Sequence, residues 1–309
     1  MVNSNYNGPS VEVVQVSKFY NKQKVTALSE VSLQVNKGEL FGLIGPDGAG
    51  KSSLFRILTT LLLPDRGSAK VEGLDVVESY AQIRKMIGYM PGKFSLYQDL
   101  TVIENLEFFA TVFNTSIEEN YELIKDIYVQ IEPFKDRPAG KLSGGMKQKL
   151  ALCCALIHQP HLLLLDEPTT GVDPVSRKEF WEMLKRLKEK GISIMVSTPY
   201  MDEAEMCDRV ALIQNGKIMS IDTPLAITKA FPFQLYAFRV PNMYKLLQAL
   251  TTDAQVNTSY TFGEYIHVTI KDNDVNGLIE RLKYPMNEEI EYKTIEAGIE
   301  DCFMQLMKN

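Results

Sequence analysis

The sequence is poor in cysteine and histidine, and it has no long apolar run. Its four cysteines form no Cys-x-x-Cys pair, so neither a zinc site nor a disulfide framework is indicated, and a reducing, cytoplasmic setting is expected. No apolar stretch approaches the roughly 18 residues that a membrane-spanning helix needs. Residues 1–10 are polar and lack the basic and then apolar pattern of a signal peptide. We therefore expect a chain that reaches a membrane only by docking onto a partner.

Positive charge is also scarce. The formal net charge is −6 at pH 7, whereas non-specific binding of nucleic acid depends on clustered Lys and Arg. We therefore expect no nucleic-acid partner. The 309 residues exceed one ordinary domain, and a hydrophobic fraction of 45% with a charged fraction of 23% is typical of a globular protein.

Short apolar segments alternate with helical patterns in the first part of the chain. Strands are predicted at residues 11–16, 31–35, 39–44, 162–165 and 192–197, and helices at 52–62 and 177–190. The last two strands are continuous apolar runs, which is typical of strands buried on both faces of a parallel sheet. The alternation predicts an α/β fold.

The pattern changes near residue 230. Tyr236, Phe238 and Val240 alternate with other residues, as do the apolar residues at 266, 268 and 270, so both segments are predicted to be half-buried strands. Apolar residues at 275, 278, 279 and 282 have helical spacing. The order strand, helix, strands, helix, strand, with a last helix at 299–307, predicts a small C-terminal α+β domain. The predicted domains are residues 1–228 and 229–309.

Residues 45–52, Gly-Pro-Asp-Gly-Ala-Gly-Lys-Ser, match the phosphate-loop pattern G-x-x-x-x-G-K-[ST] between a predicted strand and a predicted helix. The glycines let successive backbone N–H groups point at phosphates, and the following helix adds the positive end of its dipole. Lys51 is predicted to reach the β- and γ-phosphates, and the Ser52 hydroxyl to ligate Mg²⁺. We therefore predict that ATP and Mg²⁺ bind here. The predicted nucleotide-binding residues of this segment are Gly45, Pro46, Asp47, Gly48, Ala49, Gly50, Lys51, Ser52 and Ser53.

Two carboxylates follow the apolar strand at residues 162–165. At the end of a buried strand, Asp166 can lie beside the phosphates and hold Mg²⁺ through water. Glu167 can then act as the general base that polarises the attacking water. An isolated Asp-Glu pair is often only a surface turn, but the phosphate loop favours the catalytic interpretation. Glu167 and Lys51 are the predicted catalytic residues, and Ser52 and Asp166 the predicted metal ligands.

Residues 142–146, Leu-Ser-Gly-Gly-Met, open an apolar helix, and Ser143 lies 23 positions before Asp166. At this point the chain resembles the ATP-binding-cassette (ABC) family over about residues 11–225, with residues 142–146 as the signature loop. The resemblance implies a P-loop NTPase cassette with a helical subdomain at about residues 93–158. In that family two cassettes sandwich two ATP molecules, and each signature loop caps the γ-phosphate held by the other subunit. Ser143, Gly144 and Gly145 are therefore expected to contact the partner's nucleotide.

The resemblance implies further roles. Tyr20 matches the aromatic residue that stacks on adenine, with a core tyrosine as the alternative. Asp173 matches the acid of the loop that communicates across the dimer, with a plain turn before Pro174 as the alternative. Residues 97–106 resemble the region that receives the transporter's coupling helix. The C-terminal section, including residues 299–303, resembles the accessory domain of drug and polysaccharide exporters, although a structural appendage is an equal alternative.

Two positions depart from the family pattern. Gly92 stands where the family has a glutamine that reaches Mg²⁺ and water, and Pro199 stands where it has a histidine that binds the γ-phosphate. Glycine offers no side chain, and proline offers neither an imidazole nor an N–H. ATP binding is expected to survive, whereas hydrolysis at this chain's own site is expected to be impaired. The histidines at 158, 161 and 267 are interpreted as ordinary surface or core residues.

The resemblance implies an exporter subunit on the inner face of the cell membrane, with membrane permease subunits and a second cassette as partners. Its phosphate loop resembles that in the first half of tandem-cassette exporter ATPases. Because the signature loop is intact, our hypothesis is a heterodimer in which this chain completes a working site on a different cassette. A homodimer with two weakened sites stays open. So do a non-transport ABC ATPase that acts on nucleic acid or ribosomes, and a regulatory cassette that binds ATP without hydrolysing it.

Overall fold

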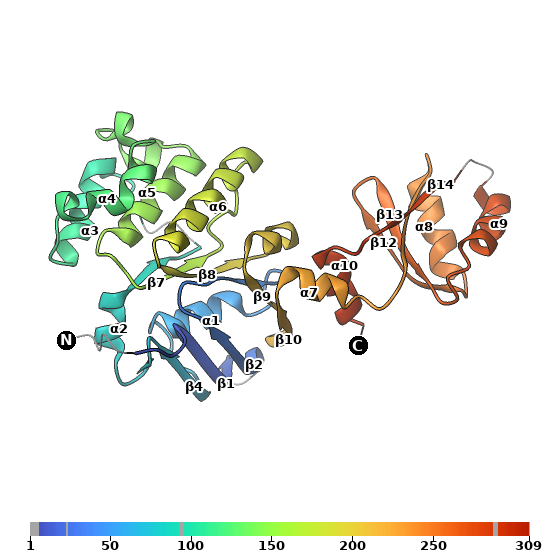
Figure 1. The fold of residues 1–309 in the computed structure, drawn as a ribbon, viewed down its shortest axis with the longest axis horizontal. Helices are drawn as coiled ribbons and strands as arrows, with labels where there is room; N and C mark the ends of the chain where they lie inside the picture. Colours follow the sequence, from blue (N-terminus) through green and yellow to red (C-terminus); the bar gives the residue numbers. More distant parts are fainter. Residues whose placement is uncertain (1–5, 23, 93–95, 287–289, 309) are drawn as a thin grey trace. The chain divides into compact units, whose positions relative to one another are not determined.

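The predicted α/β sheet is present in the computed structural model, which describes residues 6–22, 24–92, 96–286 and 290–308 (Figure 1). Its strands pair in the order β10-β9-β3-β8-β7-β6; those from β9 to β6 run parallel and β10 runs antiparallel. All residues of β7 and β8 are buried, which confirms the prediction that these two strands are covered on both faces, and all residues of β3 are buried as well. The bounds are β3 (Leu40–Ile44), β6 (Ile87–Met90), β7 (Leu162–Asp166), β8 (Ser193–Thr198), β9 (Arg209–Gln214) and β10 (Lys217–Asp222).

A second, antiparallel sheet has the strand order β2-β1-β4-β5. Its bounds are β1 (Val11–Tyr20), β2 (Val25–Val35), β4 (Arg66–Val71) and β5 (Leu74–Asp75). Val13 and Leu33 of this sheet, Phe41 of β3 and Phe55 of α1 (Lys51–Leu58) belong to one buried cluster. Each large apolar side chain contributes roughly 1.5–3 kcal/mol when fully buried. The phosphate loop is thus held between a rigid strand and a well-packed helix.

Helix α1 ends earlier than the sequence pattern predicts. The helix predicted at 52–62 ends at Leu58. Thr60 has a φ of 62°, in the left-handed region that terminates helices. The N–H groups of Leu61 and Leu62 turn back to the carbonyl of Arg56, at 2.8 and 3.0 Å. The prediction was wrong at this end because apolar spacing continues past the point where the backbone changes hand.

The helices between β6 and β7 cover the region predicted as the helical subdomain, whose first three residues, 93–95, lie outside the described residues. Thr101 and Ser116 form capping boxes at the starts of α3 and α4, with Glu104 and Glu119 respectively. Helix α5 is buried over most of its length, as a helix with apolar residues on all sides must be. The helices between β6 and β7 are α3 (Val102–Val112), α4 (Ile117–Tyr128) and α5 (Gly144–Leu156), with 3₁₀ helices at Glu132–Phe134 and Ala139–Lys141. Helix α2 (Tyr80–Met86) precedes β6, and α6 (Pro174–Glu189) and a 3₁₀ helix at Met201–Met206 follow β7.

The chain divides into two compact units, Met1–Pro224 and Leu225–Asn309, whereas the sequence predicts the boundary between residues 228 and 229. In the second unit the strand order is β12-β13-β11-β14 and all pairs are antiparallel. This is a split β-α-β arrangement, in the predicted order of elements. The bounds are α7 (Pro224–Lys229), β11 (Leu235–Arg239), α8 (Met243–Thr252), β12 (Val256–Phe262), β13 (Tyr265–Ile270), α9 (Val275–Met286), β14 (Glu291–Ile295) and α10 (Ile299–Leu306).

A buried polar cluster fixes α10 to the sheet of this second unit. The Oδ1 atom of Asp301 lies 2.7 Å from His267 Nδ1 and accepts a hydrogen bond from the Tyr260 hydroxyl at 2.6 Å. Burial alone would raise the pKa of Asp301, but the hydrogen bonds from His267 and Tyr260 outweigh it and hold that pKa below its usual value. No helix in the described ranges is long and apolar enough to cross a membrane.

Candidate nucleotide-binding site

The loop 45–50 connects β3 to α1 through two positions that only glycine fits. The N–H of Gly45 donates to the carbonyl of Thr198 at 3.2 Å, and a Cβ at position 45 would lie 2.2 Å from the carbonyl oxygen of Ile213. Gly50 has a φ of 107°, and a Cβ there would lie 2.3 Å from the carbonyl oxygen of Ala27. The loop leads directly into the first turn of α1, whose dipole favours a bound anion.

Lys51 uses all three of its ammonium donors at this loop. Its Nζ donates to the carbonyl oxygens of Gly45 and Pro46, at 2.8 and 3.0 Å, and lies 3.1 Å from Glu167 Oε1. The Lys51 side chain is only 3% exposed, so its charge is placed by these contacts and not by solvent. The structure thus brings the two predicted catalytic side chains into direct contact.

One serine hydroxyl fixes both acids at the end of β7. Ser197 of β8 donates from its Oγ to Asp166 Oδ1 at 2.5 Å, and the same Oγ accepts the N–H of Glu167 at 3.0 Å. Asp166 is buried, and Glu167 has a φ of 52°. A left-handed glutamate is uncommon, and such backbone strain is typical of functional sites. Sequence reasoning did not identify Ser197; the available signal was a serine at the end of a buried apolar strand.

The oxygen donors of this region fit Mg²⁺ at a phosphate site. Mg²⁺ in such sites is held by one or two protein ligands together with substrate phosphates and water. Asp166 and Ser52 provide hard oxygens of this kind. The described residues contain no group of three or more His, Cys, Asp and Glu that would form an all-protein metal cage. Asp166 and Ser52 are the side chains here that would hold Mg²⁺ together with bound phosphates.

Gly92 lies directly beside Asp166 at the end of β7. A Cβ at position 92 would lie 3.2 Å from the carbonyl oxygen of Asp166 and 3.8 Å from its Oδ2, so a side chain here would start next to the predicted metal ligand. A cavity of about 30 Å³ lies at this point, bordered by Gly92, Gln148, Glu167 and Thr170 among others. The Oε1 atom of Gln148 is buried and has no hydrogen-bond partner in the described structure. Gly92 itself thus offers no polar side chain to this cavity, whereas the Gln148 side chain borders it.

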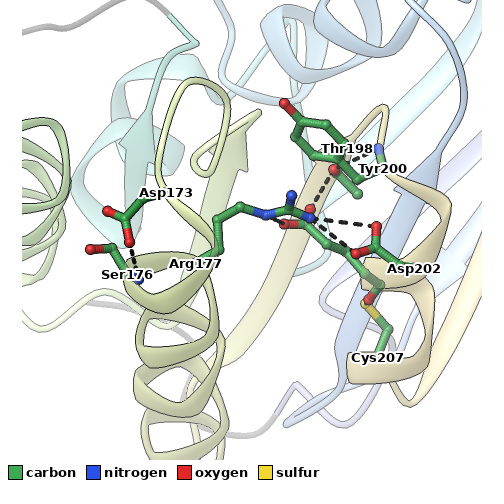
Figure 2. A network of polar contacts seen from close by, with 8 residues as sticks. Asp173, Ser176, Arg177, Thr198, Tyr200, Asp202 and Cys207 are labelled. Carbon is green, nitrogen blue, oxygen red and sulfur yellow. Dashed lines mark hydrogen bonds and ion pairs between the residues drawn. The ribbon is translucent and has the colours of Figure 1, made fainter.

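Pro199 lies in a tight turn after β8. The hydroxyl of Thr198 accepts the N–H of Tyr200 at 3.1 Å and donates to Glu203 Oε2 at 2.5 Å. Figure 2 shows Thr198 and Tyr200 facing Arg177, whose Nε lies 3.2 Å from Glu203 Oε1. The segment is thus held by its neighbours, while Pro199 itself contributes no polar side chain.

The signature loop lies next to the start of α6. Ser143 caps α5 by accepting the N–H of Met146 at 3.4 Å, and a Cβ on Gly145 would lie 2.9 Å from Ser176 Oγ. Asp173 caps α6 by accepting the Ser176 N–H at 3.0 Å, and this backbone hydrogen bond lowers the pKa of Asp173. The structure therefore gathers Gly145 and Asp173 around Ser176.

Tyr20 lies at the end of β1, and its hydroxyl is 3.2 Å from Ser53 Oγ. The structure thus brings these two predicted nucleotide-binding residues together at the first turn of α1.

Comparisons with known proteins give a consistent result. Residues 28–170 match the family model described as ABC transporter. The chain is 41% identical over 249 residues to the probable multidrug ABC transporter ATP-binding protein YbhF of Escherichia coli (strain K12), a match that covers 79% of this chain and only 43% of YbhF. It is 38% identical over 296 residues to the Nod factor export ATP-binding protein I of Burkholderia lata, which covers 94% of this chain and 93% of that protein.

Solved structures agree with the sequence relatives. The fold is similar to the dimeric structure of MJ0796, described as a bacterial ABC transporter cassette, with a TM-score of 0.62 and 26% identity over 69% of this chain and 98% of that chain. It is also similar to a structure described as the ATP-binding subunit of an ABC transporter, with a TM-score of 0.65 and 29% identity over 72% of this chain and 92% of that chain.

Proposed function

The chain belongs to the ATP-binding cassettes of the ABC transporter family, and on this basis we propose that it binds ATP in a dimeric sandwich and couples ATP hydrolysis to export by separate membrane subunits. The observation that carries the proposal is the contact between Lys51 of the phosphate loop and Glu167 at the end of β7, 3.1 Å apart. The phosphate loop, the buried ammonium of Lys51 and the predicted general base Glu167 lie in contact with one another. Phosphoryl transfer to water needs such groups side by side.

Each protein group has a definite task in this proposal. The backbone of the loop and Lys51 hold the β- and γ-phosphates, and Ser52 and Asp166 hold Mg²⁺, which when bound neutralises developing charge on the phosphates. Glu167 accepts the proton of the attacking water. Ser197 orients Asp166 through its hydroxyl and Glu167 through the backbone N–H.

We assign the weaker of two unequal sites to this chain's own phosphate loop. Gly92 and Pro199 remove two polar side chains beside the predicted metal and γ-phosphate positions. The signature loop, by contrast, is intact and lies beside Asp173, where the family resemblance places the dimer interface. A heterodimer with a different cassette accounts for this division; a homodimer with two weakened sites is the second arrangement. The substitutions also favour a regulatory cassette that binds ATP without turning it over as the second candidate function.

Steady-state ATP hydrolysis separates these outcomes. The purified chain alone is expected to bind MgATP and to hydrolyse it slowly, and a partner cassette that contributes its own phosphate loop is expected to restore turnover. Rapid hydrolysis by the chain alone, abolished by Glu167→Gln, would refute the impaired site. Absence of turnover in the assembled complex would favour the regulatory cassette.

The export direction rests on the relatives, one named for multidrug transport and one for Nod factor export. A non-transport ABC ATPase is the alternative.

An apolar groove on the surface of the first unit favours a transporter with a membrane partner over this alternative. This groove of about 290 Å³ lies between the segment that follows α1, the helices α2, α3 and α5, and β6. We propose that it receives a cytoplasmic helix of the permease. The groove is lined by Leu61, Tyr89, Phe109, Phe113, Cys154 and His158 among others.

Leu61 offers a direct test of this docking groove. It is 59% exposed although it is apolar, so an acidic substitution there will not disturb the core. Leu61→Asp is expected to abolish co-purification with the permease and to leave MgATP affinity unchanged. Val129→Asp is the matched control, since Val129 is 48% exposed and does not line the groove. Equal loss of binding in both variants, or in neither, would contradict the docking site.

A further inference from the structure

Arg177 joins two segments that the proposed function assigns to different tasks. From the first turns of α6 its guanidinium reaches the segment that follows β8 (Figure 2): Nε lies 3.2 Å from Glu203 Oε1, and Nη2 lies 3.2 Å from Asp202 Oδ2. The guanidinium carbon also lies 4.2 Å from the centroid of the Tyr200 ring. A planar fork with five donors can make these contacts at once, which a lysine cannot.

Glu203 makes this contact obligatory. Its side chain is 3% exposed, and a buried carboxylate is strongly unfavourable without a paired charge and hydrogen bonds. Arg177 supplies the charge at one oxygen, and Thr198 donates to the other at 2.5 Å. A shift of Arg177 therefore has to displace Glu203 and, through it, the hydroxyl of Thr198.

Thr198 and its neighbour border the nucleotide site. The carbonyl of Thr198 accepts the N–H of Gly45, the first residue of the phosphate loop, at 3.2 Å. The preceding residue, Ser197, holds both Asp166 and Glu167. The contacts of Arg177 thus lead through Glu203 and Thr198 to Gly45 of the phosphate loop. They lead onward through Ser197, the neighbour of Thr198, to the predicted metal ligand Asp166.

At its other end Arg177 is tied to the loop that faces the partner in the proposed dimer. Its backbone N–H donates to the carbonyl of Asp173 at 2.9 Å. Asp173 caps the same helix through Ser176, and Ser176 borders Gly145 of the signature loop. A movement of loop 170–173 is therefore transmitted to the guanidinium of Arg177 through one turn of helix.

We propose that Arg177 is a positioning residue that couples occupancy of this chain's own nucleotide site to the loop 170–173 at the dimer-facing end of α6. This inference rests on the proposed function. Pro199 offers no side chain with which to sense a phosphate, so the position of residues 198–203 is set by Arg177 instead. ATP binding at this slowly hydrolysing site thereby still changes the conformation of the loop 170–173.

Amide hydrogen exchange with and without MgATP tests this coupling. In the wild-type chain, MgATP is expected to slow exchange at residues 45–53 by direct binding, and at residues 170–177 and 198–206 through Arg177. A coupling at the low end of the usual range corresponds to about a fivefold change at 170–177. Each variant is compared with itself with and without nucleotide, so changes in intrinsic exchange cancel.

The informative variant is Arg177→Met combined with Glu203→Gln, because Arg177→Met alone leaves a buried charge unpaired and can unfold the chain. The double variant is expected to bind MgATP and to protect residues 45–53, but to lose the change at 170–177. Arg177→Lys keeps the positive charge but not the planar guanidinium with its five donors. This variant is expected to retain part of the nucleotide-dependent change at 170–177. Lys188→Met is the control: Lys188 lies on the same helix as Arg177, and the substitution breaks its 2.8 Å pair with Asp208, which precedes β9. This variant is expected to leave the response intact.

Two results would overturn the coupling role. One is a full response at 170–177 in the double variant, and the other is a wild-type chain that binds MgATP with no change at 170–177. A wild-type chain that binds no MgATP would instead overturn the proposed function, so the two failures are distinguishable.

Discussion

Glu167 is expected to compete with nucleotide phosphates for Lys51. Its carboxylate lies 3.1 Å from the Lys51 ammonium, which also donates to two backbone carbonyls. Phosphate oxygens need the same ammonium, so the Lys51–Glu167 contact has to open before they bind. Glu167→Gln removes the negative charge and keeps the shape, so we expect tighter nucleotide binding and lost turnover.

The exposure of the pair sets the size of this effect. Lys51 is 3% exposed and Glu167 is 23% exposed. Exposed ion pairs contribute about 0.2–1 kcal/mol, and hydrogen bonds to charged groups about 1.5–3 kcal/mol. We therefore expect a gain of about 1 kcal/mol, or roughly fivefold in Kd. General-base loss lowers turnover by about 10²–10⁴-fold.

Titration calorimetry with MgADP is the decisive assay, because ADP affinity does not depend on whether ATP is being hydrolysed. Glu179→Gln is the matched control: it removes the same charge from the 2.9 Å pair that Glu179 of α6 makes with Lys149 of α5. The reasoning is refuted if Glu167→Gln leaves MgADP affinity unchanged. It is also refuted if Glu179→Gln tightens binding equally, because the effect would then reflect net charge alone.

Three further outcomes follow from the structure. Gly92→Gln with Pro199→His is expected to raise ATP turnover by the lone chain by about tenfold or more, since a single transition-state donor is worth at least that much; unchanged turnover would place the defect elsewhere. The low pKa of Asp301 contributes stability that is complete above its unfolded pKa and is lost as pH falls through the lower folded value. Urea unfolding of the second unit should therefore lose part of its acid sensitivity in Asp301→Asn, and the rest stays because the hydrogen bond from Arg281 also lowers the pKa of Asp253. Equal sensitivity in Asp301→Asn would contradict the assignment. Phe238→Ala, at a fully buried position, should lower the free energy of unfolding by about 3–5 kcal/mol in urea titrations.

The parts of the fold that the sequence predicts well are those set by local pattern. The strand before Gly45 and the strand before Asp166 are continuous apolar runs, and the loop motif fixes what must lie between strand and helix. The order of elements in the second unit also follows from spacing alone. The end of α1 could not be predicted from spacing, because the left-handed backbone of Thr60 ends the helix while the apolar spacing continues.

The contacts that orient the site are long-range and could not be predicted in this way. Ser197 and Asp166 are 31 positions apart, and they meet only because β7 and β8 pair in one parallel register. Arg177 and Glu203 are 26 positions apart and meet between a helix and a loop. Such partners depend on strand order, which no single segment of sequence specifies.

The predicted inequality of the two sites has a physical basis in where the substitutions lie. Gly92 borders Asp166, and Pro199 directly follows Thr198, whose carbonyl binds the phosphate loop. The intact signature loop borders Ser176, at the start of α6. The two substituted positions and the intact signature loop therefore lie in separate places. In our proposal, the chain keeps the loop that a partner's nucleotide needs and has lost two side chains that its own nucleotide needs. Arg177 is the residue that spans the two places, and for this reason its removal is expected to uncouple them without emptying either.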